Sequence, residues 1–137
     1  MARGEYQFFY PFRVRYSEID GQKIVFNSHY LTYFDTAITE FLRAHREDLA
    51  DIEGEFEFHT VKNLVEYKAP IYFDEEIDVG VRISRIGSSS LTFSIEIHSK
   101  GLDDLRTSGE VVWVYTDQAS RKTVPVPEIY HQIMAES

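Results

Sequence analysis

The chain has 137 residues, 43% of them hydrophobic, a formal net charge of −9 at pH 7 and no cysteine. This length and apolar content predict a single folded domain over residues 1–137 and exclude a disordered chain. The acidic balance argues against nucleic acid as a partner, and the lack of cysteine excludes disulfides, thiolate metal sites and a cysteine nucleophile.

The first predicted element is a strand at residues 8–16. Apolar and aromatic side chains occupy every second position from Phe8 to Tyr16, which is the period of a strand with one buried face. Pro11 has no amide hydrogen to donate, so we expect this strand to lie at an edge of its sheet.

A long helix is predicted over residues 28–46. Either Asn27 or Ser28 can cap its first turn. Its apolar side chains recur at three- and four-residue intervals and form one stripe: Tyr30, Phe34, Ala37, Ile38, Phe41 and Leu42, widened by Leu31. So broad an apolar face needs a wide partner, and a curved sheet is the expected one.

After an acidic loop at residues 46–57, the sequence predicts four further strands. They are predicted at residues 58–68, 75–85, 90–99 and 105–117, with hairpin turns at residues 87–89 and 100–104. The last strand is apolar on both faces around Trp113, which predicts a central strand covered on both sides. A short helix is predicted from Glu128. The layout predicts an α+β fold in which an antiparallel sheet wraps around one long central helix.

The turn between the first strand and the long helix carries Asp20. Unpaired amides at a helix N-terminus attract negative charge, and a carboxylate that faces them can attack an acyl carbonyl or activate water beside it. An aspartate in a turn also commonly accepts a hydrogen bond from its own backbone. On spacing alone, this second role is the favoured one.

Several motifs, in order along most of the chain, resemble the hotdog-fold acyl-CoA thioesterases of the 4-hydroxybenzoyl-CoA thioesterase type. The family pattern runs roughly Tyr-x-Asp-x-Asp-x-x-Gly-x-Val-Tyr/Trp-x-x-x-Tyr before an aromatic-rich helix. Here residues 16–30 read YSEIDGQKIVFNSHY, and the similarity continues at residues 67–75, 87–90 and 124–127. The resemblance implies the hotdog fold and hydrolysis of an acyl- or aroyl-CoA thioester to the free acid and CoA.

The resemblance also implies roles for individual residues. Asp20 falls on the catalytic aspartate, acting as nucleophile or general base, and the backbone amide of Asn27 falls where the family polarises the carbonyl; the Phe26 amide is a second candidate donor. We expect substrate contacts from Phe26, Ser28, His29, Thr60, Val61 and Lys62, and contacts to the CoA portion from Arg85, Ser88 and Ser89. No metal or other cofactor is expected, since CoA enters only as part of the substrate. A homodimer or homotetramer with its sites between subunits is implied.

Three features depart from the family pattern. Asn27 replaces a histidine, tyrosine or similar residue common in relatives, although the amide role needs only the backbone. Lys23 stands where the family has a glycine, so it either changes the turn geometry or brings an ammonium group near a phosphate. The arginine cluster that some relatives use for CoA phosphates is missing at residues 87–89.

Other titratable side chains are given less active roles. Glu18 is expected to be solvated rather than part of an acid–base pair, and Asp35 and Glu40 to be solvated or at an interface. His29 is expected to pack or hydrogen-bond as a neutral side chain, with substrate contact as its alternative role, and His59 is expected to be structural. No histidine and carboxylate spacing indicates a metal site.

Alternative functions remain open at this stage. The same fold can act on acyl-acyl-carrier-protein, although the charge of −9 disfavours docking of an acidic carrier. A non-catalytic acyl-CoA-binding protein is a second alternative, and a dehydratase would need a histidine–carboxylate pairing that is not apparent. No apolar run reaches the roughly 20 residues of a membrane span and no signal peptide is present, so we expect a cytoplasmic protein without a membrane partner.

Overall fold

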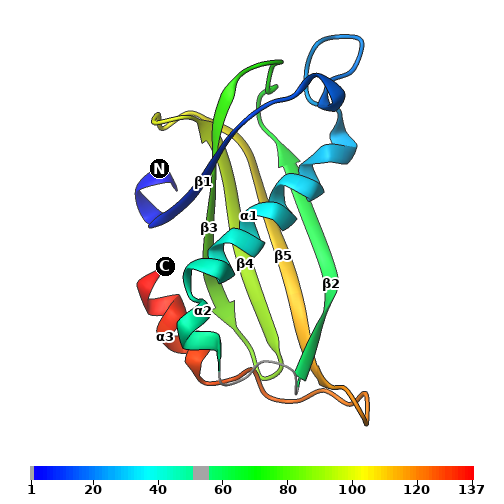
Figure 1. Cartoon of the computed structure of the whole chain (residues 1–137), viewed down its shortest axis with the longest axis vertical. Coiled ribbons are helices and arrows are strands. Elements are labelled where there is room, and N and C mark those ends of the chain that lie inside the picture. The colour runs from blue at the N-terminus through cyan, green and yellow to red at the C-terminus, as the bar shows by residue number, and fades with distance from the viewer. Residues whose placement is uncertain (1, 51–55) are drawn as a thin grey trace.

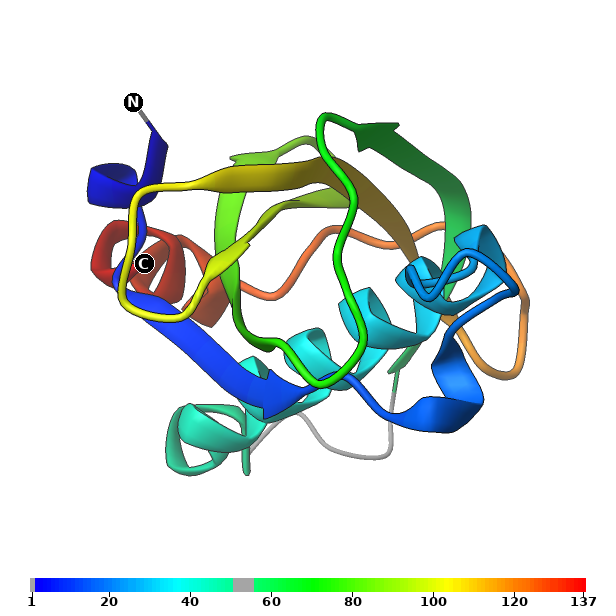
Figure 2. The same cartoon turned by 90° about the horizontal axis from the view of Figure 1, so that it is seen from above.

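The computed structural model describes residues 2–50 and 56–137, which form one antiparallel sheet wrapped around a helix (Figures 1 and 2). The five strands lie in the order β1-β3-β4-β5-β2. Their bounds are β1 Phe8–Arg13, β2 Phe56–Tyr67, β3 Glu76–Ile86, β4 Ser90–Ser99 and β5 Leu105–Asp117. The helices are α1 Tyr30–Ala44, α2 Arg46–Leu49 and α3 Ile129–Glu136, and 3₁₀ turns cover Ala2–Glu5, Tyr16–Glu18 and Asn27–His29. No helix of the described residues is long and apolar enough to cross a membrane.

Strand β1 is an edge strand, as Pro11 predicts, but it is shorter than expected. The Val14 amide donates to the Glu75 carbonyl (3.0 Å), and the chain then turns through Tyr16–Glu18 instead of continuing along β3. Tyr16 is therefore not on the buried face, and 78% of its surface is exposed. The predicted loop at residues 46–57 begins with α2, and residues 51–55 lie outside the described residues.

The core forms between one face of α1 and the concave face of the sheet. Phe41 of α1 makes edge contacts with Phe8 of β1 and Phe93 of β4, with ring centroids 5.5 and 6.2 Å apart. The predicted stripe is buried except at its margins, because Leu42 is half-buried and Leu31 is 41% exposed, whereas Tyr33 is buried in its place. The broad apolar face thus packs on a curved sheet, as expected.

The prediction that β5 is covered on both sides is wrong for a single chain. Strand β5 is internal, between β4 and β2. Its inward side chains Val111, Trp113 and Tyr115 are buried, but the outward Val112 and Val114 are only half-buried. Apolar runs in a strand do not by themselves require a second layer.

Arg106 fixes the segment that crosses from β2 to β3. Its guanidinium donates to the Pro70 carbonyl (2.8 Å), to both carboxylate oxygens of Glu75 (3.0 and 2.6 Å) and to Asp104 (3.0 Å). Its carbonyl accepts from the amides of Lys68 (2.9 Å) and Ala69 (3.0 Å). Burial opposes ionisation of Glu75, but hydrogen bonds from Arg106, the Tyr72 amide and Ser99 outweigh it and lower the pKa of that carboxyl. The ionised pair therefore stabilises the fold at neutral pH.

We expect Gly109→Ala to lower the free energy of unfolding by about 2 kcal/mol, the cost of overpacking a filled core. A Cβ at this position of β5 would overlap the ring of Phe34 and lie 2.6 Å from the Leu64 carbonyl oxygen. The measurement is urea denaturation. Gly4→Ala is the control, because nothing lies within 4 Å of a Cβ added there. Equal stability of the two variants would contradict the close approach of α1 to β5.

Glu75→Gln should destabilise the protein by about 2 kcal/mol at pH 7, because it removes the charge that Arg106 binds. The pKa of Glu75 is lower in the folded than in the unfolded chain. Its contribution is therefore complete above the unfolded value of about 4.3 and is lost as pH falls through the folded pKa. Urea midpoints from pH 7 to 3.5 should converge for the variant and the wild type. A difference that does not change with pH would contradict the ionic origin.

Candidate active site

Residues 19–25 form a closed turn ahead of α1. The Asp20 amide donates to the Ile24 carbonyl (2.9 Å) and the Lys23 amide to the Asp20 carbonyl (3.0 Å). Lys23 adopts a φ of 63°, the left-handed conformation that a glycine would adopt without strain and that costs another residue about 1–2 kcal/mol. The substitution at Lys23 therefore leaves a glycine-like turn in place, at an energetic cost.

The Asp20 carboxylate is half-buried, and only one of its two oxygens has a hydrogen-bond partner among the described residues. Its Oδ1 accepts a hydrogen bond from the Gln22 amide (2.8 Å), which is the local bond that many turn aspartates make. Its Oδ2 has no hydrogen-bond partner among the described residues. One oxygen thus orients the carboxylate and the other remains available.

The segment between β2 and β3 runs along this turn and holds it. The Val25 amide donates to the Ile71 carbonyl (2.8 Å), and the Phe73 amide donates to the Lys23 carbonyl (3.1 Å). Ile24 and Tyr72 form an isolated antiparallel bridge. Because Arg106 anchors the same segment, the position of Asp20 depends on a side chain of β5.

Glu18 ties the turn to α1, so the expectation that it is solvated is wrong. The half-buried carboxylate accepts from the Tyr33 hydroxyl (2.9 Å) and from the Arg15 amide (2.8 Å). Burial, together with the hydrogen bond to Glu18, raises the pKa of the Tyr33 hydroxyl, which stays protonated at neutral pH. Glu18 is therefore a structural side chain that orients the start of the helix.

The beginning of the helical stretch includes an amide without a partner among the described residues, that of Asn27. The Phe26 amide donates to the Glu18 carbonyl (2.9 Å), which removes it as a candidate oxyanion donor. The Asn27 amide has no partner within residues 2–50 and 56–137. It opens the 3₁₀ turn Asn27–His29, which continues directly into α1.

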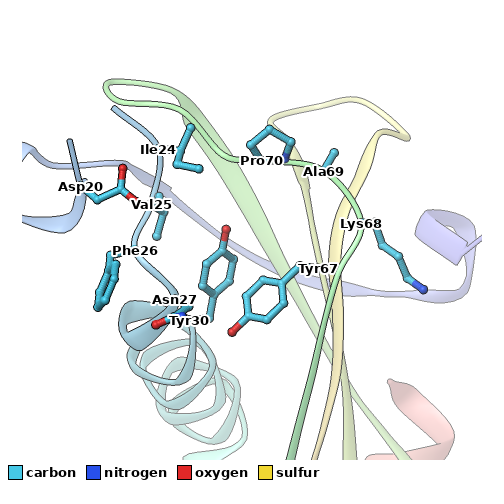
Figure 3. A pocket seen from close by; sticks show the side chains of 10 residues that line it. All are labelled: Asp20, Ile24, Val25, Phe26, Asn27, Tyr30, Tyr67, Lys68, Ala69 and Pro70. Atoms are coloured by element: carbon cyan, nitrogen blue, oxygen red, sulfur yellow. The ribbon is translucent and has the colours of Figure 1, made fainter. Parts of the chain in front are cut away.

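These groups line a cavity of about 530 Å³. In Figure 3, Asp20 and Asn27 lie on one side of it, while the segment from Tyr67 to Pro70 forms the other side. The rings of Tyr30 and Tyr67 meet edge to face between them, with centroids 4.9 Å apart. The lining comprises Asp20, Ile24, Val25, Phe26, Asn27, Tyr30, Tyr67, Lys68, Ala69 and Pro70. A carboxylate, a free amide and apolar walls thus face one space.

Residues 14–133 match the family model described as "Thioesterase-like superfamily". The chain belongs to that superfamily. An "Acyl-CoA thioester hydrolase YbgC" of Escherichia coli is 28% identical over 122 residues, which are 88% of this chain and 90% of that protein. The match confirms the family and the enzyme class predicted from the sequence, a thioesterase.

Solved structures confirm the hotdog fold. The PA5185 protein of Pseudomonas aeruginosa superposes with a TM-score of 0.83 at 28% identity, covering 98% of this chain and 93% of that one. Slr0204, a 1,4-dihydroxy-2-naphthoyl-CoA thioesterase from Synechocystis, gives a TM-score of 0.81 at 18% identity, covering 94% and 96%.

The predicted site residues of this thioesterase fall into three places. Asp20, Phe26 and Asn27 line the cavity, while Ser28 and His29 lie in the adjoining 3₁₀ turn without lining it. Residues 60–62 lie in the middle of β2, at a bulge, and Lys62 pairs with Glu110 at 3.3 Å. These three do not meet Asp20 within one chain.

The residues expected to hold CoA lie at the far end of the molecule. Arg85, Ser88 and Ser89 belong to the hairpin between β3 and β4, drawn at the bottom of Figure 1, whereas the Asp20 turn is at the top. Strand β3 has 11 residues, so at about 3.3 Å per residue roughly 30 Å separate its two ends. A role for this hairpin therefore requires a second protomer, and it stays a prediction.

Sequence reasoning missed the opposite wall of the cavity, Tyr67 to Pro70, and the Tyr30 ring. Residues 67–70 carried a signal, because they belong to the motifs that resemble the family. Their distance along the chain from Asp20 hid the contact.

One group of possible metal ligands occurs in the described chain, at His45, Asp48 and Glu136, whose ligand atoms lie within 4.8 Å of one another. His45 follows the last residue of α1, so this group is at the other end of that helix from Asp20.

Proposed function

We propose that this protein hydrolyses an acyl- or aroyl-CoA thioester to the free acid and CoA. The observation that carries the proposal is the shared cavity of Asp20 and Asn27, in which one carboxylate oxygen and one amide have no partner among the described residues. The name of the Escherichia coli relative, an acyl-CoA thioester hydrolase, supports the choice of substrate.

The chemistry requires that negative charge on the carbonyl oxygen be stabilised as the tetrahedral state forms. The Asn27 amide and the positive end of the helical stretch supply that stabilisation, and a single donor of this kind contributes a factor of about 100 to 1,000 in rate. The Gln22 amide holds Oδ1 of Asp20, so Oδ2 faces the carbonyl carbon. The apolar walls limit the access of bulk water to the acyl group.

Two routes use the same geometry. In the first, Oδ2 attacks the carbonyl carbon, the C–S bond breaks, CoA leaves as the thiol after protonation, and water hydrolyses the resulting anhydride. In the second, Oδ2 takes a proton from water, whose oxygen attacks the carbonyl carbon. Single turnover in ¹⁸O-water distinguishes them, because only the anhydride route places the label in the Asp20 carboxylate or leaves unlabelled acid.

Asp20→Asn should lower kcat at least about 100-fold, because the amide is neither a base nor an effective nucleophile. Thiol release from a panel of acyl-CoA and aroyl-CoA thioesters is the measurement, with circular dichroism to establish folding. Asp35→Asn is the control, since Asp35 is an exposed carboxylate on α1 outside the cavity. Wild-type turnover by folded Asp20→Asn would rule out the mechanism.

We further propose that the protein works as a homo-oligomer that pairs through β2. This strand is an edge of the sheet, 12 residues long, and such an edge is a template for pairing with another chain. It exposes four large apolar side chains, Phe58 (40%), Val61 (60%), Leu64 (37%) and Tyr67 (55%). Pairing of two β2 strands would bring residues 60–62 and the β3–β4 hairpin of one protomer toward the Asp20 turn of the other.

Val61→Lys should convert the oligomer to a monomer and reduce kcat/KM at least tenfold, because charges repel across the paired edges. Light scattering after size exclusion gives the mass, and thiol release gives the activity. Leu102→Lys is the matched control, since Leu102 is equally exposed (59%) but lies between β4 and β5. A wild-type monomer with full activity would overturn the oligomer proposal and leave the chemistry of Asp20 intact.

A further inference from the structure

A second cavity adjoins the Asp20 turn and shares Asp20 with the first. Its volume is about 530 Å³, and it is lined by Tyr16, Ile19, Asp20, Gly21, Lys23 and Phe73. We refer to it as the Tyr16 cavity. Among the described residues, Asp20 alone lines both cavities. A molecule whose reacting bond lies at Asp20 can therefore extend in two directions from it.

The Tyr16 cavity presents aromatic rings to solvent. Tyr16 is 78% exposed and Phe73 is 44% exposed, and their rings stand edge to face with centroids 5.9 Å apart. These exposed fractions leave ring surface accessible to a flat partner. Exposed aromatic side chains are the usual stacking surfaces for nucleobases.

The same cavity contains an unpaired cation. The ammonium group of Lys23 has no hydrogen bond or ion pair with any residue in the described ranges, whereas Lys62, Lys68 and Lys100 pair with carboxylates. Lys23 also occupies a left-handed position where glycine would be relaxed. A strained, unpaired lysine in a chain of net charge −9 indicates an anionic partner that the protein itself does not supply.

The first cavity has the opposite character. The one cation among its described lining residues is Lys68, whose side chain extends away from the space in Figure 3 and pairs with Glu66 at 3.6 Å. Its remaining lining is mostly apolar. An uncharged acyl group suits this cavity, and the phosphorylated end of a CoA thioester suits the Tyr16 cavity.

We propose that the Tyr16 cavity binds the phosphorylated purine nucleotide end of the CoA thioester, with the adenine against Tyr16 and a phosphate on the Lys23 ammonium. The flexible pantetheine arm would pass over the turn at Gly21. The assignment rests on the proposed function. It differs from the sequence-based assignment of the nucleotide to Arg85, Ser88 and Ser89.

Lys23→Gly is the decisive variant, because glycine keeps the left-handed backbone and removes only the charge. We expect KM for an acyl-CoA to rise about tenfold with kcat unchanged. This is the result when a mutation removes an interaction that binds the ground state and the transition state equally. The same acyl group on N-acetylcysteamine, which lacks the nucleotide, should show no such penalty. Tyr16→Ser should likewise raise KM only for the CoA thioester.

Arg121→Gly is the matched control. Arg121 is also a cation with a φ of 63°, but it pairs with Glu57 at 3.5 Å and does not line either cavity. Both glycine variants should melt a few degrees above wild type, because both relieve the same backbone strain. Only Lys23→Gly should change KM.

Three outcomes decide the proposal. An unchanged KM of Lys23→Gly, or an equal penalty on the truncated thioester, overturns it. A rise in KM for Arg85→Ser but not for Lys23→Gly places the nucleotide on the β3–β4 hairpin and also overturns it. If the wild type hydrolyses neither thioester, the proposed function fails separately. Calorimetry with free CoA on the wild type and Lys23→Gly then still tests the cavity. Tenfold weaker binding of CoA to the variant supports the proposal, and equal binding rejects it.

Discussion

The hydrogen bond from the Val25 amide to the Ile71 carbonyl joins the two chain segments on which the site depends. One segment carries Asp20 and leads into α1, and the other crosses from β2 to β3. Arg106 holds the crossing segment through Pro70 and Glu75. The carboxylate therefore sits on a turn fixed from both sides, which suits a reaction that needs preorganised charge.

The ionic groups that hold this scaffold together differ from the polar groups around Asp20 in how many partners they have. Buried or half-buried ionic groups such as Arg106, Glu75 and Glu18 have several partners each and act on the architecture. Three groups without a partner among the described residues, Oδ2 of Asp20, the Asn27 amide and the Lys23 ammonium, lie on or next to one turn. A ligand at this turn would give partners to all three of these groups.

Local patterns predicted the fold well because its elements have clear periods. The strands at residues 90–99 and 105–117 coincide with β4 and β5, since turn residues flank both of these apolar-rich segments. The errors lie where a tertiary contact overrides the local pattern. Tyr16 continues the alternation of β1 but turns outward, and Glu18 looks like a surface residue until Tyr33 of α1 donates to it. The sequence predicted half of the site, because Asp20 and Asn27 are close in sequence. The other half, Tyr67 to Pro70, approaches them only in the folded chain.

The position of Asp20 as a partition between two cavities has a consequence for turnover. If the acyl group and the nucleotide lie on opposite sides of this partition, the two products separate as soon as the thioester bond breaks. The acid would then dissociate from the first cavity and the thiol from the Tyr16 cavity, so that release of one product does not depend on release of the other. Substitutions in the Tyr16 cavity would then alter the rate of thiol release without altering the bond-breaking step.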